Sequence, residues 1–481
     1  STAAKAAAKA RAEVYPSEAS VGQASAGQAS SGLASFAKGS ARGTSQRSSS
    51  KGSHKSTPPG STRRPSISSS ISLSIASVRS AWKDPPKVTA RATTANFITG
   101  GLGCAMFSLP WSMAGSSIIT SVVIIAAVLL VNAWTIWILV RAAERYQKFD
   151  LGSILRRLPR GLGRPLEAIF NIFVWLAQFL CVVSYIIVMH DSAEALVSGT
   201  WLHDRVLLVG LASAIVLPFN FLSLRLLART SSFAILVNVY LFILVGVLYG
   251  QGIANDELPE GSCVFGSTWR GNFAMITVAI QAITVQMCVL PMYRDLEDRT
   301  PEKFDKIVAV SFTALFFLFS GFSTVAYLLV GPGVQSNILQ DLPDGPAFAV
   351  AQVGIIFMVA CVYPIMIIPM IAPLEEGEAP IFGVLDRCWS VFAAKFLIVA
   401  GTMVTAVFVP TVGLATVITG ALSSLIFIVL VPSVVGLVLL DVSKLHKAAL
   451  WLLILVGGAV SLVGFVFIDN YVDDLTCIVE G

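Results

Sequence analysis

Charged residues are scarce in this chain. Of its 481 residues, 13% are Asp, Glu, Lys or Arg, and 55% are hydrophobic, whereas a soluble domain carries about 25% charged and about 45–50% apolar residues. The shortage of charge excludes an ordinary soluble enzyme. The abundance of apolar residues excludes a wholly disordered chain, because disorder requires few of them.

Several chemical signatures are missing as well. The chain contains long apolar runs that we interpret as membrane spans, and no charged residue lies near the centre of any of them. This excludes an arginine voltage sensor and a carboxylate proton chain. No phosphate-binding P-loop appears, and neither does a zinc-protease or nucleophile-elbow motif. No pair of cysteines has metal-ligand spacing. We therefore expect no enzymatic activity, no cofactor and no metal, which leaves a secondary transporter as the main class.

Large apolar residues are nearly absent from residues 1–88, which are rich in Ser, Ala and Gly and carry thirteen bases against three acids. Such a segment cannot bury enough surface to offset the entropy of ordering it. We predict a disordered, basic, cytoplasmic tail that is either a solvated linker or the binding site of a cytoplasmic partner. The net charge of +5 arises from this tail and does not indicate nucleic-acid binding.

Long apolar runs fill the remainder of the chain. A membrane-spanning helix needs about 20 apolar residues, and eleven such runs follow one another with short polar breaks. They form a predicted all-α polytopic membrane domain at residues 89–470, embedded in membrane lipid. The predicted spans are 91–114, 117–141, 165–190, 205–224, 231–253, 270–292, 306–331, 346–373, 394–410, 412–440 and 447–468.

Basic residues are concentrated in every second loop between these spans. If the tail is cytoplasmic, nearly all Lys and Arg lie in cytoplasmic loops, and the opposite loops are acidic, as the positive-inside rule requires. Eleven spans then place residues 471–481 outside the cytoplasm, in a plasma-membrane or a vacuolar or other endomembrane protein. Cys263 and Cys477 fall on that outer side, where they form either a disulfide or two separate thiols.

The first span contains a concentration of glycines. Gly100, Gly101 and Gly103 each cost about 1 kcal/mol relative to alanine in a helix. An interrupted helix is tolerated in a membrane where its backbone lines a cavity. We predict a break here, with the backbone of 100–103, Leu102 included, binding a substrate carboxylate through N–H groups and the helix dipole. Close helix packing by small residues is the alternative.

The sixth span groups Thr284, Gln286 and Cys288 at depth and contains Pro291, which removes one helix hydrogen bond. It lies five spans after the first. Interruptions at corresponding places in two halves indicate a transporter binding site. We therefore expect spans 1–5 and 6–10 to be inverted repeats with broken first and sixth helices, plus one extra helix.

Three segments resemble motifs of the amino acid/auxin permease family, within the amino acid–polyamine–cation superfamily. They are residues 103–110 (its Gly-x-Gly-x-Leu-x-x-Pro signature), 291–296 (Pro-Ile-Tyr-x-Glu-Leu) and 363–369 (Tyr-Pro-Leu-x-x-x-Pro). The resemblance implies an inverted-repeat fold, alternating access and amino-acid substrates. It also implies a binding role for Asn96, which aligns with a family Asn, and leaves open that of Thr99, which stands where many relatives have Asn.

Other candidate residues follow from their positions. Thr284 or Gln286 would accept from the substrate amino group, unless Gln286 only bonds another helix. Tyr185 would close over the substrate, unless it is a core aromatic. His190 and Asp191, at the predicted end of the third span, are candidates for proton coupling, with a solvated loop histidine as the alternative.

Function is predicted at the level of class. Residues 346–373 contain no Ser or Thr, whereas sodium-coupled proteins of the resembled fold use hydroxyls of this span to bind the ion. We therefore expect secondary transport of amino acids that is proton-coupled or passive. An amino-acid-sensing receptor that signals through the tail and a structural membrane subunit remain as alternatives.

Overall fold

The computed structural model describes residues 87–466, except 160, 198–203, 222–223 and 377–386. Of the predicted tail at 1–88, only residues 87 and 88 are described, and the predicted tail at 471–481 lies outside these residues. Apart from one isolated β-bridge, the regular structure of the described part is helical. Its helices are α4 (Ala90–Gly101), η3 (Cys104–Ser108), α5 (Leu109–Ser116), α6 (Ile118–Tyr146), α7 (Leu151–Leu155), α8 (Gly163–Val197), α9 (Arg205–Phe219), α10 (Leu224–Asn255), α11 (Trp269–Ile283), α12 (Gln286–Asp295), α13 (Pro301–Val330), η4 (Ile338–Gln340), α14 (Pro346–Glu376), α15 (Arg387–Phe408), α16 (Val412–Ser423), η5 (Ser424–Leu430), α17 (Val431–Val438) and α18 (Lys444–Val466).

The number of spans is smaller than predicted. Within the described residues, nine helices are long and apolar enough to cross a membrane, and the bent pair α4 and η3–α5 makes a tenth. The predicted fourth span is the helix α9, which has only 15 residues. At 1.5 Å per residue it is shorter than the roughly 30 Å hydrocarbon layer.

Threonine begins four of the membrane helices. The side chains of Thr89, Thr268, Thr300 and Thr411 each accept a hydrogen bond from the backbone N–H three residues further on. This is the N-cap arrangement, which satisfies one of the N–H groups that a helix start leaves without a partner. The short polar breaks between apolar runs therefore also supply the start signals of helices.

Large apolar side chains project from the outside of the bundle. Leu130 of α6, Phe317 of α13 and Leu455 of α18 are 72%, 67% and 70% exposed. In water so many exposed apolar groups would be an aggregation liability, whereas in a bilayer they contact lipid. The outer surface therefore supports the membrane assignment made from composition.

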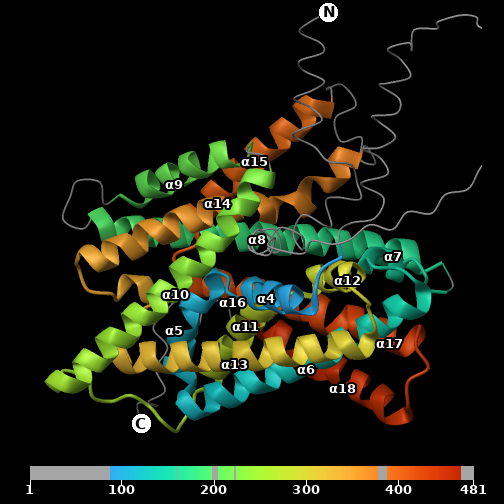
Figure 1. The fold of residues 1–481 in the computed structure, drawn as a ribbon, viewed down its shortest axis with the longest axis horizontal. Helices are drawn as coiled ribbons and strands as arrows, with labels where there is room; N and C mark the ends of the chain where they lie inside the picture. Colours follow the sequence, from blue (N-terminus) through green and yellow to red (C-terminus); the bar gives the residue numbers. More distant parts are fainter. Residues whose placement is uncertain (1–86, 160, 198–203, 222–223, 377–386, 467–481) are drawn as a thin grey trace, which may run out of the picture.

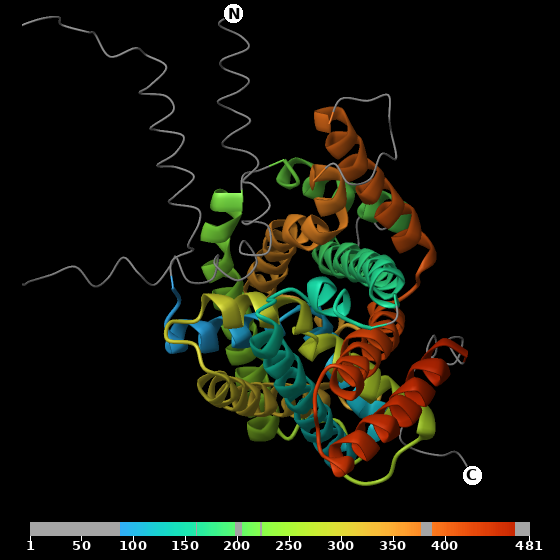
Figure 2. The same ribbon diagram turned by 90° about the vertical axis from the view of Figure 1, so that its right-hand side faces the viewer.

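Helix α8 lies at the centre of the bundle. It packs against α14, α15, α16 and α9, and Figure 2 shows it nearly end-on among the other helices. Its first residues adjoin α7 and its last residues adjoin η4, so these two short helices mark opposite ends of the bundle. Figure 1 shows the long helices running between these ends, with α7 at the right. We call them the α7 end and the η4 end.

The α7 end holds a backbone contact between the starts and ends of distant helices. Val88 donates its N–H to the Asp295 carbonyl at 2.8 Å and accepts from the Glu297 N–H at 2.9 Å, in a parallel bridge opposite Leu296. An ion pair joins the same group of helices, because Arg141 of α6 lies 2.9 Å from Asp305 of α13. The segment that enters α4 is thereby attached to the segment that leaves α12.

The tenth predicted span contains a widened turn. Its residues form α16, the π-helical segment η5 and α17 in succession. Pro432, at the start of α17, has no N–H to donate to the preceding turn, and a π-turn is one way in which a helix absorbs such a defect.

Candidate functional site

The first helix is interrupted where the glycines are concentrated. Helix α4 ends at Gly101, and the Leu102 N–H closes its last turn on the carbonyls of Ile98 and Thr99. Gly103 is extended, with φ −90° and ψ −179°, and η3 begins at Cys104. The two parts bend by 49°. By helix geometry the N–H groups that open η3 have no partner inside it.

The sixth predicted span is interrupted at Thr284 and Val285. Thr284 is extended, with ψ 95°, and separates α11 from α12. Pro291, which the sequence offered as a source of disruption in this span, lies inside α12. The interruption occurs six residues earlier, and the pair remains straight enough to count as one span.

Asn132, in the middle of α6, holds the second interruption. Its Nδ2 donates to the Ile283 carbonyl at 3.0 Å, where α11 ends. Its Oδ1 accepts from Nε2 of Gln286, where α12 begins. The side chains of Asn132 and Gln286 are both fully buried. The sequence analysis missed Asn132, although a lone asparagine in the apolar run 118–140 is itself a signal.

The two interruptions face each other. An added Cβ on Gly100 would lie 3.7 Å from Cγ1 of Val285. An added Cβ on Gly103 would meet no heavy atom within 4 Å, so Gly103 borders open space. Gly101 differs, because its Cβ would lie 2.9 Å from the Leu315 side chain of α13. Gly101 therefore packs against a neighbouring helix, as the small-residue alternative required.

One buried acceptor at this place has no partner. Oε1 of Gln286 is buried, and the described residues offer it no hydrogen bond. An unsatisfied buried acceptor costs about 1–3 kcal/mol. It is therefore available to a donor from outside the chain.

The remaining residues predicted to bind substrate lie near these interruptions, and their side chains make different contacts. Asn96 is buried one turn before the first interruption. The hydroxyl of Thr99 donates to the Ala95 carbonyl at 2.8 Å, and that of Thr284 donates to the Ile280 carbonyl at 2.6 Å. Tyr185 of α8 is buried with its hydroxyl near the thiols of Cys104 and Cys181, which places it beside the start of η3.

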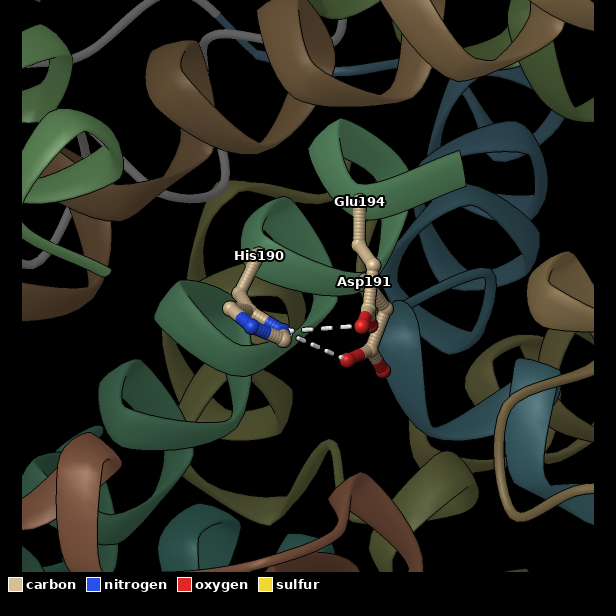
Figure 3. Close-up of side chains that lie close together, drawn as sticks. All are labelled: His190, Asp191 and Glu194. Atoms are coloured by element: carbon tan, nitrogen blue, oxygen red, sulfur yellow. Dashed lines mark hydrogen bonds and ion pairs between the residues drawn. The ribbon is translucent and has the colours of Figure 1, made fainter. Parts of the chain in front are cut away.

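His190 and Asp191 are buried, and the prediction that the third span ends at 190 was wrong. Helix α8 continues to Val197, and both side chains are only 4% exposed. His190 Nδ1 lies 3.0 Å from Asp191 Oδ1 and 3.9 Å from Oε2 of Glu194. Figure 3 shows the three polar ends converging from one helix. The solvated-loop alternative for His190 is excluded.

The ligand-type atoms of these three residues lie within 4.8 Å of one another, close enough for a metal ion. The arrangement fits hydrogen bonding better, because the His190 nitrogen that faces the carboxylates is already bonded to Asp191. A structural zinc site also requires four ligands, and this group supplies three. We interpret the His190, Asp191 and Glu194 side chains as a hydrogen-bonded cluster.

Comparison with known proteins identifies the family. Residues 86–468 match the family described as transmembrane amino acid transporter protein. The chain belongs to this family. The match confirms the resemblance drawn from the three motifs and makes the chain an integral, multi-pass membrane protein of a transporter family, not an enzyme.

Two curated relatives of this transporter illustrate the range of the family. Amino acid transporter AVT6E of Arabidopsis thaliana is 22% identical over 404 residues, which cover 77% of this chain and 81% of the relative. Sodium-coupled neutral amino acid symporter 2 of Danio rerio is 21% identical over 313 residues, which cover 56% of this chain and 60% of the relative.

Solved structures support the fold of the transporter. The inward-facing conformation of Mhp1 matches with a TM-score of 0.51 at 13% identity, covering 81% of this chain and 93% of that chain. At this identity the likeness concerns the fold alone. It shows that the order and packing of the helices recur in another membrane protein.

The cysteines of the transporter leave one prediction open. Cys263 is disulfide-bonded, whereas Cys104, Cys181, Cys288 and Cys361 form no disulfide. The predicted partner, Cys477, lies outside the described residues, so the pairing of Cys263 with Cys477 stays a prediction.

Proposed function

We propose that this protein is a secondary active transporter that moves amino acids across a membrane by alternating access. The fold is then a 5+5 inverted repeat of eleven spans, in which the short α9 serves as the fourth span and α18 lies outside the repeat. The interruptions at the first and sixth spans support this proposal, because they occupy corresponding places in the two halves. The family match supplies the class of substrate.

The observation that carries the proposal is the juxtaposition of the two interruptions, with a buried, unpartnered acceptor at the second. The N–H groups at Gly103 and the start of η3 would bind the substrate carboxylate. Oε1 of Gln286 and the carbonyls freed at Thr284 would accept from its ammonium group. Such a site binds a zwitterion without any charged side chain, which agrees with the uncharged centres of the spans.

Substituting Gly103 with valine should reduce uptake at least about tenfold, because the branched side chain would fill the space beside the interruption. The conformation of Gly103 is extended, so valine fits the backbone and the fold should survive. The measurement is uptake of a panel of labelled amino acids into proteoliposomes, together with the thermal stability of the purified protein.

Gly458→Val is the matched control, since a Cβ there also meets nothing within 4 Å and α18 lies outside the proposed repeat. Its uptake should equal that of the parent. Full uptake by Gly103→Val would refute the site. Binding of an amino acid without any uptake would favour the sensing alternative over transport.

We further propose that transport is proton-coupled or passive. Helix α14 provides no hydroxyl of Ser or Thr in its Pro346–Glu376 sequence, although one relative is named as sodium-coupled. Replacing sodium with choline should leave the uptake rate unchanged in proteoliposomes. A marked fall in the initial rate would contradict this proposal.

The α7 end is proposed to face the cytoplasm. Arg141, Arg145 and Arg299 gather there, and each contacts an aromatic ring or a carboxylate. Lys87 and Val88 lie at the same end, where they bond the end of α12 and the residues after it. This distribution follows the positive-inside rule and places η4 on the outer side of a plasma or endomembrane.

A further inference from the structure

The connection between α13 and α14 closes over the η4 end of the bundle. Ser336, Asn337 and Leu339 of this segment are buried. A Cβ on Gly413 of α16 would lie 2.8 Å from Cβ of Ser336 and 2.9 Å from the Trp111 ring of α5. The segment therefore packs against α16, next to α5, and is partly buried in the bundle. We call residues 331–345 the outer lid.

The outer lid is bonded to the carboxylates of the cluster on α8. Asn337 donates its Nδ2 to Oδ2 of Asp191 at 2.8 Å, and Gln340 donates its Nε2 to Oε2 of Glu194 at 3.5 Å. The other oxygen of Asp191 faces His190. η4 also packs against η3, next to the first interruption. The lid is thus attached both to the cluster and to the proposed substrate site.

Closing the lid buries a cluster whose charge depends on one proton. With a neutral imidazole, the closed lid would cover the Asp191 carboxylate, whose hydrogen-bond partners among the described residues are the imidazole and the Asn337 amide. Burying uncompensated charge is costly. A protonated His190 compensates one carboxylate, so closure becomes cheaper once a proton is bound. Histidine ordinarily changes charge between about pH 5 and 8.

We propose that His190, Asp191 and Glu194 form a proton-binding site that latches the outer lid in its closed position. Glu194, with a side chain 30% exposed, connects the buried pair to solvent. Proton uptake at the η4 end then favours the closed lid, and proton loss favours its release. The proposal deepens the proposed function, on which it rests for its role in transport.

The surrounding elements supply no other partner for His190 among the described residues. The lid contributes Asp341, which accepts from the Gln335 N–H, and the exposed Asp344. On α9, Asp204 caps its own helix and Arg205 donates to carbonyls of α15 and the residues that follow it. α16 and α5 contain no charged residue. The charges of α14 and α15 lie toward the α7 end of those helices: Glu375, Glu376, Arg387 and Lys395.

Labelling of a cysteine beneath the lid tests the latch without requiring transport. Ser336→Cys places a thiol at a buried position of the lid, and its maleimide labelling rate is measured from pH 5.5 to 8 over the background of the parent. Dividing by the rate of the same protein with His190→Gln cancels the intrinsic pH dependence of the thiol. The ratio should fall at least about threefold toward pH 5.5, within the tenfold per unit that one proton allows.

Two further variants make the result specific. Asp191→Asn removes one buried carboxylate, so its labelling should stay low at pH 8, opposite in direction to the effect of His190→Gln. His446→Gln is the matched control, because His446 lies near α6 and stacks on Trp137 instead, and it should behave as the parent.

A ratio that does not change with pH would overturn the latch, and uptake by the same protein would show that the transporter proposal stands independently. A pH dependence that EDTA abolishes would also overturn it, since a bound metal would then operate the lid. A pH-dependent ratio in a protein that takes up no amino acid would keep the latch and refute transport.

Discussion

Replacing Asn132 with leucine should lower amino-acid uptake at least about tenfold while the protein still reaches the membrane. The change leaves the Ile283 carbonyl and the Gln286 amide buried without the partner that now joins them. Each orphaned group costs about 1–3 kcal/mol. The interruption between α11 and α12 would lose its support and shift toward a continuous helix, which removes the freed carbonyls proposed to bind the ammonium group.

A double-mutant cycle measures this connection directly. Uptake is compared for Asn132→Leu, Gln286→Leu and the double variant. Since one hydrogen bond joins the two residues, the double variant should lose less than the product of the two single losses. Independent, multiplying losses would show that Asn132 and Gln286 do not work as a pair.

Asn238→Leu is the matched control for the cost of removing a buried asparagine. Asn238 is buried in α10, and its Nδ2 donates to the Ala234 carbonyl of its own helix. The substitution removes this bond and a 3.7 Å contact from Nδ2 to Sδ of Met358 in α14, but no contact between half-helices. Uptake should therefore remain close to that of the parent, and equal losses in the two variants would refute the specific role of Asn132.

Replacing Gly271 with valine should abolish the folded bundle. A Cβ at this position would lie 2.0 Å from the carbonyl carbon and oxygen of Gly115, and backbone atoms cannot move aside as a flexible side chain can. Overpacking a core ordinarily costs about 1–3 kcal/mol, and a clash between two backbones exceeds that range. The start of α11 would lose its contact with the end of α5, including the bonds from Thr268 to the Gly115 carbonyl.

The measurement is the monodisperse fraction and thermal stability of the purified protein in detergent. Gly321→Val is the matched control, because Gly321 of α13 is exposed and a Cβ there meets nothing within 4 Å. The control should purify like the parent. A stable, monodisperse Gly271→Val protein would show that α5 and α11 are not in backbone contact.

The two interruptions show how far the chain could be interpreted without its fold. The first was predicted within two residues, because three glycines in four positions disfavour helix locally. The second was predicted only as an interruption somewhere in the sixth span, with Pro291 as one local signal, whereas it lies at Thr284 and Val285. Its support comes from Asn132, which is about 150 residues distant in the chain, so no local propensity reveals it.

His190 illustrates a second limit. Its neighbours Asp191 and Glu194 suggested the polar end of a span. The helix nevertheless continues, and the side chains of His190 and Asp191 are buried. Asn337 of the lid donates a hydrogen bond to Asp191, and Gln340 donates one to Glu194. Polar residues at a span end therefore do not distinguish a loop from a buried cluster until the facing segment is known.

The sequence alone determined the class of this protein: apolar runs with uncharged centres and basic residues in every second loop define a multi-pass membrane protein, and three motifs resemble those of a transporter family. These properties depend on composition and spacing, which are local. Only the tertiary structure decided where the sixth span is interrupted, that Gly101 packs against Leu315, and that His190 lies beneath a lid. Those features depend on contacts between residues far apart in the chain, and the free energy of each is set by the group that comes to face it.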